Sequence, residues 1–352
     1  MAELGVGIVG ANPDTGWAFT AHVPAIAATE GLRVTAVATT REATAKRAAA
    51  ELGTDVGWHT DPVALVRDPK VDIVLISVKV PKHRELIMPA LEAGKQVLSE
   101  WPLGVDTAEA TALAEAADRA GVRGFIGFQG RGDPVINQAR RLIGDGALGE
   151  LQALSVRSSR SKGSAISAAN AYTLDVSSAA GNLEVHGGHL IDLLGHLIPG
   201  LAVINGETAL LRRTYRIAGT ETEVTATSPD VFTAAVRLGD SGGVGGLTVW
   251  DGDPDARTVI TLQGLDGRLD LHTVDPGGDH RLRQPQMAPF AGMITVGGRT
   301  TDLAPPPNDL PVAARNVATL YANLVRDLRE GTTTAPTFAD AVAVHRELDL
   351  IR

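Results

Sequence analysis

Short apolar runs alternate with alanine-rich segments over about the first 125 residues. The runs are continuously apolar, which is typical of parallel strands that are covered on both faces. The expected strands are LGVGIVG (4–10), RVTAVAT (33–39), VDIVLISV (71–78), KQVLS (95–99) and RGFIGF (123–128). The alternation predicts βαβ units, and their right-handed crossovers build a doubly wound parallel sheet of the Rossmann type.

Capping residues mark where the intervening helices begin and end. Starts are expected at Thr39 with Glu42, at Asp61 with Pro62 and at Asp106 with Glu109, and stops at Gly53 and Gly121. Pro89 lies inside RELIMPALEAG, where we expect it to kink the helix. The loops after residues 10, 39, 78 and 99 then meet at the carboxyl ends of the strands, which predicts that they line one ligand pocket.

After residue 130, alternating apolar and polar positions predict half-buried strands. A helix that begins at Asp133 and Pro134 and ends near Gly144 comes first. The expected strands are LQALSVRSS (151–159), FTAAVRLG (232–239), VGGLTVW (244–250), RTVITLQ (257–263) and GRLDLH (267–272), with a hairpin turn in GLDGRL. We therefore expect a second α/β domain with a large, mostly antiparallel sheet.

The last part of the chain is expected to contain two loops and two helices. DPGGDHRLRQPQMAPFAGM (275–293) and LAPPPNDLP (303–311) are loop-rich and could cover the cleft. One helix is expected from about Pro311 to Gly331, and another from Thr337 onward, where Thr337 and Asp340 form a cap. We place the domains at 1–128 and 129–352, with the last helices able to pack back on the first domain.

Composition narrows the possible partners. The chain has 352 residues and a net charge of -9, and no cluster of Lys and Arg suits a phosphate backbone, so nucleic acid is not an expected partner. The absence of Cys excludes disulfides, thiolate metal sites and cysteine nucleophiles. The N-terminus lacks a signal-peptide pattern and no run of 18 apolar residues occurs, which predicts a cytoplasmic protein without membrane association.

The first strand leads into GIVGANPDTGWAFTAHVPAI, a glycine-containing turn that opens a helix. Such a turn lets backbone N–H groups approach a pyrophosphate, although the spacing is not G-x-G-x-x-G and a glycine there can also serve the turn alone. Its place after the first strand of a βαβ unit favours a dinucleotide. The candidate cofactor-binding residues are Gly7, Gly10, Asn12, Gly16, Trp17, Thr40, Arg41, Val78, His83, Glu100, Trp101 and Gln129.

The end of the second strand bears on the choice between NAD and NADP. NAD-specific proteins place an acid there for the ribose 2′-hydroxyl, whereas this chain reads ATTREA, with no acid before Arg41. The Arg41 guanidinium and the hydroxyls of Thr39 and Thr40 suit a 2′-phosphate. NADP is therefore favoured and NAD stays open, while the alternative for Arg41 is an ordinary solvated residue in the first turn of a helix.

Over essentially its whole length the chain resembles the glucose–fructose oxidoreductase, inositol dehydrogenase and rhizopine-catabolism (Gfo/Idh/MocA) family. The segments that carry the resemblance are GIVGAN, VPKHRELIMPALEAGKQVLSEWPL, FQGRGDPVINQARRLIGDGALGEL and GGHLIDLLGHL. GANPDTGWAFTAHVPAI, SEWPLG and FQGR are most similar to the branch that contains the yeast galactose-pathway repressor. The resemblance implies a Rossmann domain, a C-terminal α/β domain whose sheet forms dimers or tetramers, and hydride exchange between a nicotinamide and a small sugar-like or cyclic substrate.

The family signature is Glu-Lys-Pro after the fourth or fifth strand, with an Asp and a His on a helix of the second domain. Glu100, Pro102 and His189 match it, but Trp101 stands in place of the lysine. The aspartate position falls at Val185. An indole N–H is a neutral donor with no proton to give, so Trp101 cannot do what the lysine does at the substrate oxygen.

His189 is the leading candidate for acid/base chemistry, because imidazole titrates near neutral pH and the resemblance places it facing the nicotinamide. His186 and Asp192 lie three residues to either side, and on one helix they would share a face on which Asp192 orients or charges His189. The glycines at 187 and 188 leave the helix start open. The alternatives are a buried core histidine and a metal site, and the metal reading has the spacing but no other support.

Three further residues are candidates for the substrate or cofactor side. Tyr172 could donate its phenol to a substrate oxygen or simply pack. Arg131 could bind an acidic substrate group or the cofactor, with an ion pair to Asp133 as the alternative. His83 is expected near the nicotinamide ribose, with a surface position at a helix start as its alternative.

Trp101 allows two functional interpretations beside simple space-filling. It could stack on a sugar face or wall off the nicotinamide, or it could shape a dry pocket for His189 or Tyr172. Two functions follow: an NAD(P)-dependent oxidoreductase with His189 as acid/base, or a catalytically silent dinucleotide sensor that regulates a partner protein. We expect a small-molecule substrate and a homodimer or homotetramer.

Overall fold

The computed structural model describes residues 3–14, 16–277 and 280–352. The chain forms two compact units. The first comprises Met1–Gln129 and Asp309–Ala343, and the second comprises Gly130–Asn308 and Val344–Arg352. Each unit is built around its own sheet, so each is described separately.

The first unit contains a six-stranded parallel sheet with the order β3-β2-β1-β4-β5-β6. Its strands are β1 (Leu4–Val9), β2 (Leu32–Ala38), β3 (Gly57–His59), β4 (Ile73–Ile76), β5 (Gln96–Ser99) and β6 (Gly124–Ile126). This is the expected doubly wound Rossmann sheet, whose order reverses between β1 and β4. The edge strand β3 was not predicted, because its three partly exposed residues are too few to show a period.

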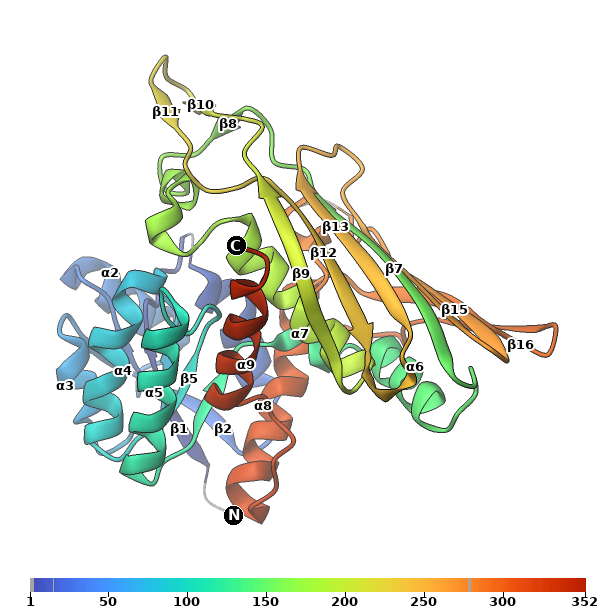
Figure 1. The fold of residues 1–352 in the computed structure, drawn as a ribbon. Helices are drawn as coiled ribbons and strands as arrows, with labels where there is room; N and C mark the ends of the chain where they lie inside the picture. The colour runs from blue at the N-terminus through green and yellow to red at the C-terminus, as the bar shows by residue number, and fades with distance from the viewer. Residues whose placement is uncertain (1–2, 15, 278–279) are drawn as a thin grey trace. The chain divides into compact units, whose positions relative to one another are not determined.

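Helices cover both faces of this sheet. They are α1 (Val23–Ala27), α2 (Glu42–Leu52), α3 (Pro62–Val66), α4 (His83–Glu92), α5 (Thr107–Ala120) and α8 (Val312–Glu330), with the start of α9 (Phe338–Asp349). The helices α3, α4 and α5 pack in succession, and α1 packs against α8 (Figure 1). The π-helical turn η1 (Ala18–His22) leads into α1.

The structure confirms most of the expected helix punctuation. The side chains of Asp61 and Asp106 accept backbone N–H groups at the starts of α3 and α5. The capping pair of Thr39 and Glu42 is wrong: Arg41 occupies the N-cap of α2, and the Thr39 hydroxyl donates to the Arg41 carbonyl instead. Thr39 lies two residues before this N-cap, so its side chain is out of register with the first N–H groups of the helix.

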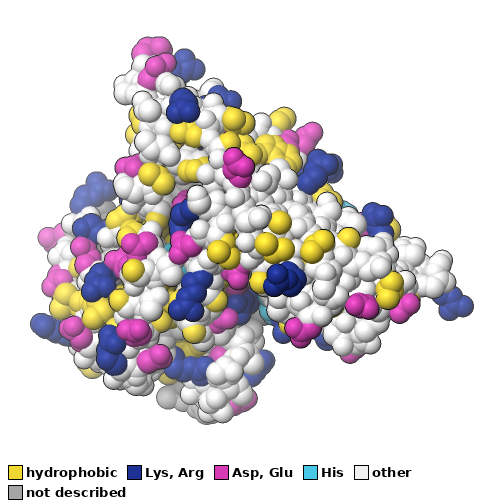
Figure 2. Space-filling model, in the orientation of Figure 1, with side chains coloured by type: hydrophobic (Ala, Val, Ile, Leu, Met, Phe, Trp, Pro, Cys, Tyr) yellow, Lys and Arg dark blue, Asp and Glu magenta, His cyan; other side chains and the backbone are white. Residues whose placement is uncertain are grey.

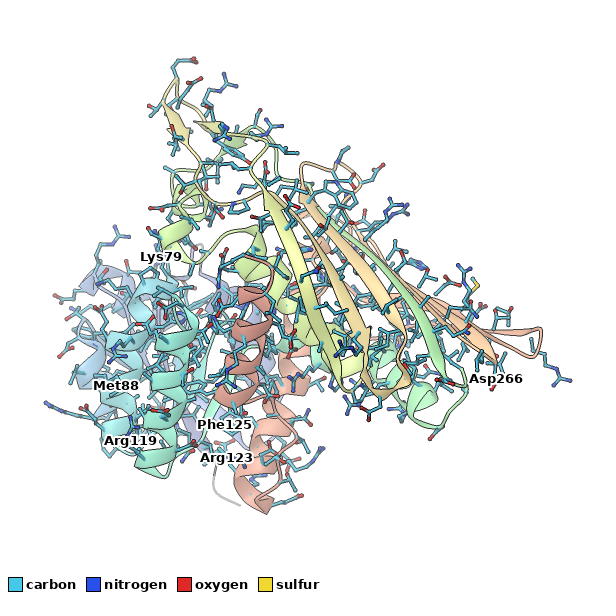
Figure 3. The ribbon with its side chains drawn as sticks, in the orientation of Figure 1. Lys79, Met88, Arg119, Arg123, Phe125 and Asp266 are labelled. Atoms are coloured by element: carbon cyan, nitrogen blue, oxygen red, sulfur yellow. The ribbon has the colours of Figure 1, made fainter. Side chains whose placement is uncertain are left out.

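The C-terminal segment of the first unit covers the edge strand β6. The Ile126 N–H donates to the Pro336 carbonyl at 3.0 Å. The Arg123 guanidinium donates to the Asp327 carbonyl at 2.8 Å and lies 5.2 Å from the centre of the Phe125 ring (Figure 3). Pairing of this kind removes an exposed sheet edge, and it explains why residues 309–343 fold with the N-terminal domain.

The second unit contains an eight-stranded, mostly antiparallel sheet with the order β17-β16-β15-β14-β7-β13-β12-β9. Its strands are β7 (Leu151–Arg160), β9 (Leu201–Ala209), β12 (Val231–Leu238), β13 (Val244–Asp251), β14 (Thr258–Gly264), β15 (Gly267–Thr273), β16 (Phe290–Val296) and β17 (Arg299–Leu303). Within this eight-stranded sheet, as far as the structure describes it, only the β7–β13 pair is parallel, and β9, β12, β13 and β7 lie side by side in Figure 1. The expected hairpin joins β14 to β15.

Two helices belong to this sheet, and a smaller sheet lies apart from it. The helices are α6 (Pro134–Gly144) and α7 (Gly188–Leu197), and the smaller sheet comprises β8 (Ala165–Ile166), β10 (Thr214–Ile217) and β11 (Glu223–Thr225). The loop expected over 275–293 is wrong in its second part, because β16 begins at Phe290. Residues 278 and 279 of that stretch lie outside the described residues.

The face of the molecule drawn in Figure 2 carries negatively and positively charged side chains. Figure 2 shows acidic and basic side chains interspersed on this face. Among the residues that the structure describes, no helix is both long enough and apolar enough to cross a lipid bilayer.

Candidate active site

A tight glycine turn follows β1. Gly10 has φ +96°, and a Cβ placed on it would lie 2.2 Å from the Ser77 carbonyl oxygen at the end of β4. A Cβ on Gly16 would lie 2.4 Å from the Asn12 carbonyl oxygen. Only glycine fits these positions, so the backbone after β1 packs closely against the end of the neighbouring strand. This is the local structure that the first βα turn of a dinucleotide fold requires.

Gly7 has a different role from the one expected. It lies inside β1, and a Cβ there would be 2.8 Å from the Leu65 side chain of α3. The glycine is therefore explained by close helix-to-strand packing, which is one of the established uses of glycine in such folds.

Two buried polar atoms beyond the carboxyl ends of β1 and β6 have no hydrogen-bond partner among the residues that the structure describes. They are the indole Nε1 of Trp17, directly after the glycine turn, and the amide Oε1 of Gln129, after β6. A buried polar group without a hydrogen bond costs free energy, so such atoms are expected to be satisfied by a ligand or by water. An N–H donor and a carbonyl acceptor suit the polar groups of a dinucleotide, and both residues were predicted from the sequence as cofactor-binding.

The end of β2 presents the residues that bear on cofactor choice. The chain leaves β2 at Ala38, and Thr40 and Arg41 are both exposed. Arg41 begins α2 from its N-cap position. An exposed guanidinium at this place is available to an anion, and no hydrogen bond to another described residue fixes its direction.

His83 is fully buried at the start of α4, so the alternative of a surface position is wrong. Its Nε2 lies 3.1 Å from the Val78 carbonyl oxygen, and its Nδ1 lies 3.3 Å from the Ser99 hydroxyl. Burial lowers the pKa of the His83 ring, which keeps it neutral. The ring therefore ties together the loops that follow β4 and β5.

Glu100 directly follows β5 and is bound to His22, which in turn is bound to Tyr321; the sequence singled out neither of these two residues. The His22 ring lies between the Glu100 carboxylate and the Tyr321 hydroxyl, at 2.9 Å from each. His22 stands in the AHVPAI segment after the glycine turn, whereas Tyr321 lies 299 residues further along the chain. Nothing in the local sequence pattern signals that these two positions meet.

Trp101 is buried, with 5% of its surface exposed. Its ring packs on Phe128 with centroids 4.8 Å apart and an angle of 39° between the planes. An aromatic pair therefore occupies the position that the sequence resemblance assigns to the family lysine, and it offers an apolar surface.

The two candidate histidines of the second unit are buried side chains on consecutive turns. His186 lies in the π-helical turn η6 (Asn182–Gly187) and His189 in the first turn of α7. Burial lowers the pKa of His189 to about 3, so the neutral-range titration expected from the sequence is wrong for the free protein. The pKa of His186 is also lowered, first by burial and then by the nearby charge of Arg160.

A line of hydroxyl groups supports His186. Its Nε2 lies 2.7 Å from the Ser158 hydroxyl of β7, which lies 2.6 Å from the Thr258 hydroxyl of β14. Ser158 and Thr258 are fully buried. The hydrogen bond to Ser158 thus holds His186 against the large sheet, and this contact helps to position the start of α7.

Asp192 is bound by Arg131 from the segment before α6. The Arg131 Nε lies 3.0 Å from one carboxylate oxygen and 3.1 Å from the other, a bidentate pair with a nearly fully buried carboxylate. The alternative pair of Arg131 with Asp133 is wrong. Asp133 instead accepts the Val135, Ile136 and Phe290 N–H groups, and burial raises its pKa to about 6.

Tyr172 is half-buried in the short helical turn Ala171–Leu174, and burial raises its pKa. Its phenol therefore stays protonated and able to donate. Within the described part of the chain, no group of three or more acidic or histidine side chains is arranged to hold a metal ion.

Comparison with known proteins finds a family match for the N-terminal part of the first unit. Residues 4–128 match the model of the oxidoreductase family with an NAD-binding Rossmann fold, Gfo/Idh/MocA. The chain is similar to dehydrogenase aclE of Aspergillus oryzae, with 30% identity over 60% of this chain and 59% of the relative. It is also similar to the scyllo-inositol 2-dehydrogenase (NAD(+)) of Bacillus subtilis, with 33% identity over 34% of this chain and 35% of that relative. The matches thus span less than two thirds of these relatives.

A solved structure is similar over nearly the whole chain. The super-repressor mutant Gal80(S2) of Gal80p from Saccharomyces cerevisiae has a TM-score of 0.88 and covers 99% of this chain and 95% of its own. Its sequence identity is 21%, so the likeness concerns the fold. Both units therefore have their counterpart in one known architecture.

Proposed function

We propose that this chain is an NAD(P)-dependent oxidoreductase acting on a sugar-like or cyclic alcohol or ketone, a proposal supported by the match of residues 4–128 to the Gfo/Idh/MocA oxidoreductase family model. The observation that carries the proposal is the Rossmann sheet with its Gly10 turn and the buried, unpartnered polar atoms of Trp17 and Gln129. A cyclic polyol is the substrate class that the name of the similar scyllo-inositol 2-dehydrogenase indicates.

A bound nicotinamide supplies or accepts the hydride, so the chain's own residues have to manage the proton at the substrate oxygen. In this proposal His189 does so. Its ring is neutral in the free protein because it is buried, and a neutral imidazole accepts the proton of an alcohol as that alcohol is oxidised. Trp101 cannot take this role, since an indole N–H does not release its proton near neutral pH.

The assignment of NADP over NAD rests on the end of β2. Thr40 and Arg41 are exposed there, and no acid precedes Arg41 after the strand. A guanidinium favours a 2′-phosphate, whereas an acid would favour the 2′-hydroxyl of NAD. NAD remains the alternative cofactor.

A turnover screen tests the proposed activity. NAD⁺ and NADP⁺ are offered with inositols, aldoses and other cyclic polyols, and NADH and NADPH with keto-sugars and cyclic ketones, for the natural chain and the His189→Ala variant. The proposal predicts that one class is turned over by the natural chain and that His189→Ala lowers kcat by about a hundredfold or more. Tight cofactor binding with no turnover on any of these compounds would sink it.

A second function is favoured by the aromatic pair of Trp101 and Phe128. With an apolar surface where the family lysine stands, the chain would bind the dinucleotide and act as a catalytically silent sensor that regulates a partner protein. The galactose/lactose regulatory protein Gal80p, whose mutant shares the fold, is a precedent for a regulator on this scaffold. A Trp101→Lys variant that gains polyol dehydrogenation, where the natural chain has none, would support this second function.

We also propose that the chain forms a homodimer or homotetramer through the open face of the large sheet. That face has a hollow of about 800 Å³ between β7, β9, β12 and β13, floored by small residues such as Gly206, Ala235 and Gly246. Val244 and Ile204, exposed at 58% and 41%, add apolar surface on the same sheet. Light scattering should give an oligomer mass for the natural chain and a lower mass for Ala235→Arg; a monomeric natural chain would contradict the proposal.

A further inference from the structure

A hydrogen-bonded series of three side chains runs through the interior of the first unit. The Nδ1 of His22 lies 2.9 Å from the Tyr321 hydroxyl, and the Nε2 lies 2.9 Å from Oε1 of Glu100. His22 and Tyr321 are fully buried, whereas the Glu100 side chain keeps 14% of its surface exposed. The series therefore has a closed end at Tyr321 and an open end at the carboxylate.

The chemistry of the three groups fixes the direction of these hydrogen bonds. An ionised carboxylate only accepts, so the Nε2–H of His22 donates to Glu100. With the hydrogen on Nε2 facing Glu100, Nδ1 can accept from the Tyr321 hydroxyl. Burial, together with the nearby charge of Glu100, raises the pKa of Tyr321 well above its usual value, so the phenol keeps the proton that it donates.

The open end of the series lies where a Rossmann sheet binds its ligand. Glu100 follows the last residue of β5, and a Cβ on Gly127, which follows β6, would lie 2.6 Å from Oε1 of Glu100. The carboxylate thus sits against the carboxyl ends of two parallel strands. His22 lies edge-on to the ring of Trp17, with centroids 6.4 Å apart, and the Nε1 of Trp17 is one of the two buried, unpartnered atoms.

We propose that His22 and Tyr321 are positioning residues that hold the Glu100 carboxylate as a fixed acceptor for the hydroxyl or amide N–H groups of the nicotinamide-riboside half of the dinucleotide. The inference rests on the proposed dinucleotide binding and adds a role for helix α8, which carries Tyr321 from the far end of the chain. Without His22, the carboxylate would lose the donor that sets its orientation.

The test is the dissociation constant of NADH and NADPH, measured by calorimetry on the full chain without substrate. His22→Leu removes both hydrogen bonds and should weaken binding about tenfold, the effect of losing a charge-assisted hydrogen bond. His22→Gln can donate to Glu100 through its amide N–H and accept from Tyr321 through its carbonyl, so it should stay within about twofold to threefold of the natural chain. Tyr321→Phe should fall between the two.

Thr29→Val serves as the matched control, because it removes a buried hydroxyl that donates to the Ala25 carbonyl within α1 and is not bonded to Glu100. It should change thermal stability but not dinucleotide affinity. The inference is overturned if His22→Leu binds like the natural chain, if His22→Gln is as weak as His22→Leu, or if Thr29→Val weakens binding equally. If the natural chain binds neither dinucleotide, the proposed function itself fails. If the natural chain binds a dinucleotide but the variants behave in one of these three ways, only the inference about His22 and Tyr321 fails.

Discussion

Replacing His189 by Gln should make the protein less sensitive to acid. His189 is 5% exposed, and burial lowers its pKa from 6.5 to about 3. The folded protein therefore resists protonation of this ring, while the unfolded chain takes up the proton near pH 6.5. The stability that depends on a neutral His189 is complete above the unfolded pKa and is lost as the pH falls toward the folded pKa.

The size of the effect follows from the gap between these two values. Between about pH 7 and about pH 4, the unfolding free energy of the natural chain should fall by about 3 kcal/mol more than that of His189→Gln, because the glutamine has nothing to titrate. Urea denaturation followed by tryptophan fluorescence measures both proteins in the same buffers, so all other titrations cancel in the difference.

A control variant separates titration from simple loss of packing. Tyr172→Phe, in the same unit, removes a phenol and leaves His189 in place, so its unfolding free energy should keep the pH dependence of the natural chain. Parallel pH dependences for the natural chain and His189→Gln would refute the reasoning, since they would mean that His189 is protonated equally in the folded and unfolded states.

Three further predictions follow from single contacts. Arg131→Met should lower the unfolding free energy by about 3 kcal/mol, because it removes the guanidinium that pairs with the buried Asp192 carboxylate. The double variant Arg131→Met/Asp192→Leu should recover much of that loss, and urea denaturation measures both. Gly10→Ala should abolish measurable NADH binding in calorimetry and lower thermal stability, since its Cβ would overlap the Ser77 carbonyl and φ +96° disfavours alanine. Arg41→Ala should weaken NADPH about tenfold with NADH unchanged; equal effects on both cofactors would remove the argument for NADP.

Continuous apolar runs allowed the first sheet to be predicted from the sequence, because each parallel strand is covered on both faces and shows its full length. Seven strands were not predicted, namely β3, β8, β9, β10, β11, β16 and β17, and the physical reason is clear for β3 and β16. β3 has three partly exposed residues at a sheet edge, and β16 begins at Phe290 within a stretch whose prolines and glycines indicate a loop. The pattern of apolar and polar residues in a short segment does not show whether that segment will pair with the edge of a sheet formed by distant parts of the chain.

The candidate site was predictable only where a residue's neighbours lie close in sequence. The turn at Gly10 is such a case, whereas the partner of Asp192 is not. The helical spacing allows Asp192 to serve His189, yet the permanently charged Arg131, 61 residues away, binds the carboxylate. The assembly of Glu100 with His22 and Tyr321 likewise depends on the tertiary fold and leaves no periodic signal.

The most direct test of the central claim pairs two measurements on the natural chain and His189→Gln. One is the dissociation constant of the preferred dinucleotide, and the other is the steady-state rate of its reduction with the best cyclic alcohol. The account predicts affinities within about twofold and a rate at least about a hundredfold lower in the variant, because His189 handles the proton and does not hold the cofactor. Equal rates in the two proteins, or a natural chain that binds the dinucleotide and turns nothing over, would contradict it.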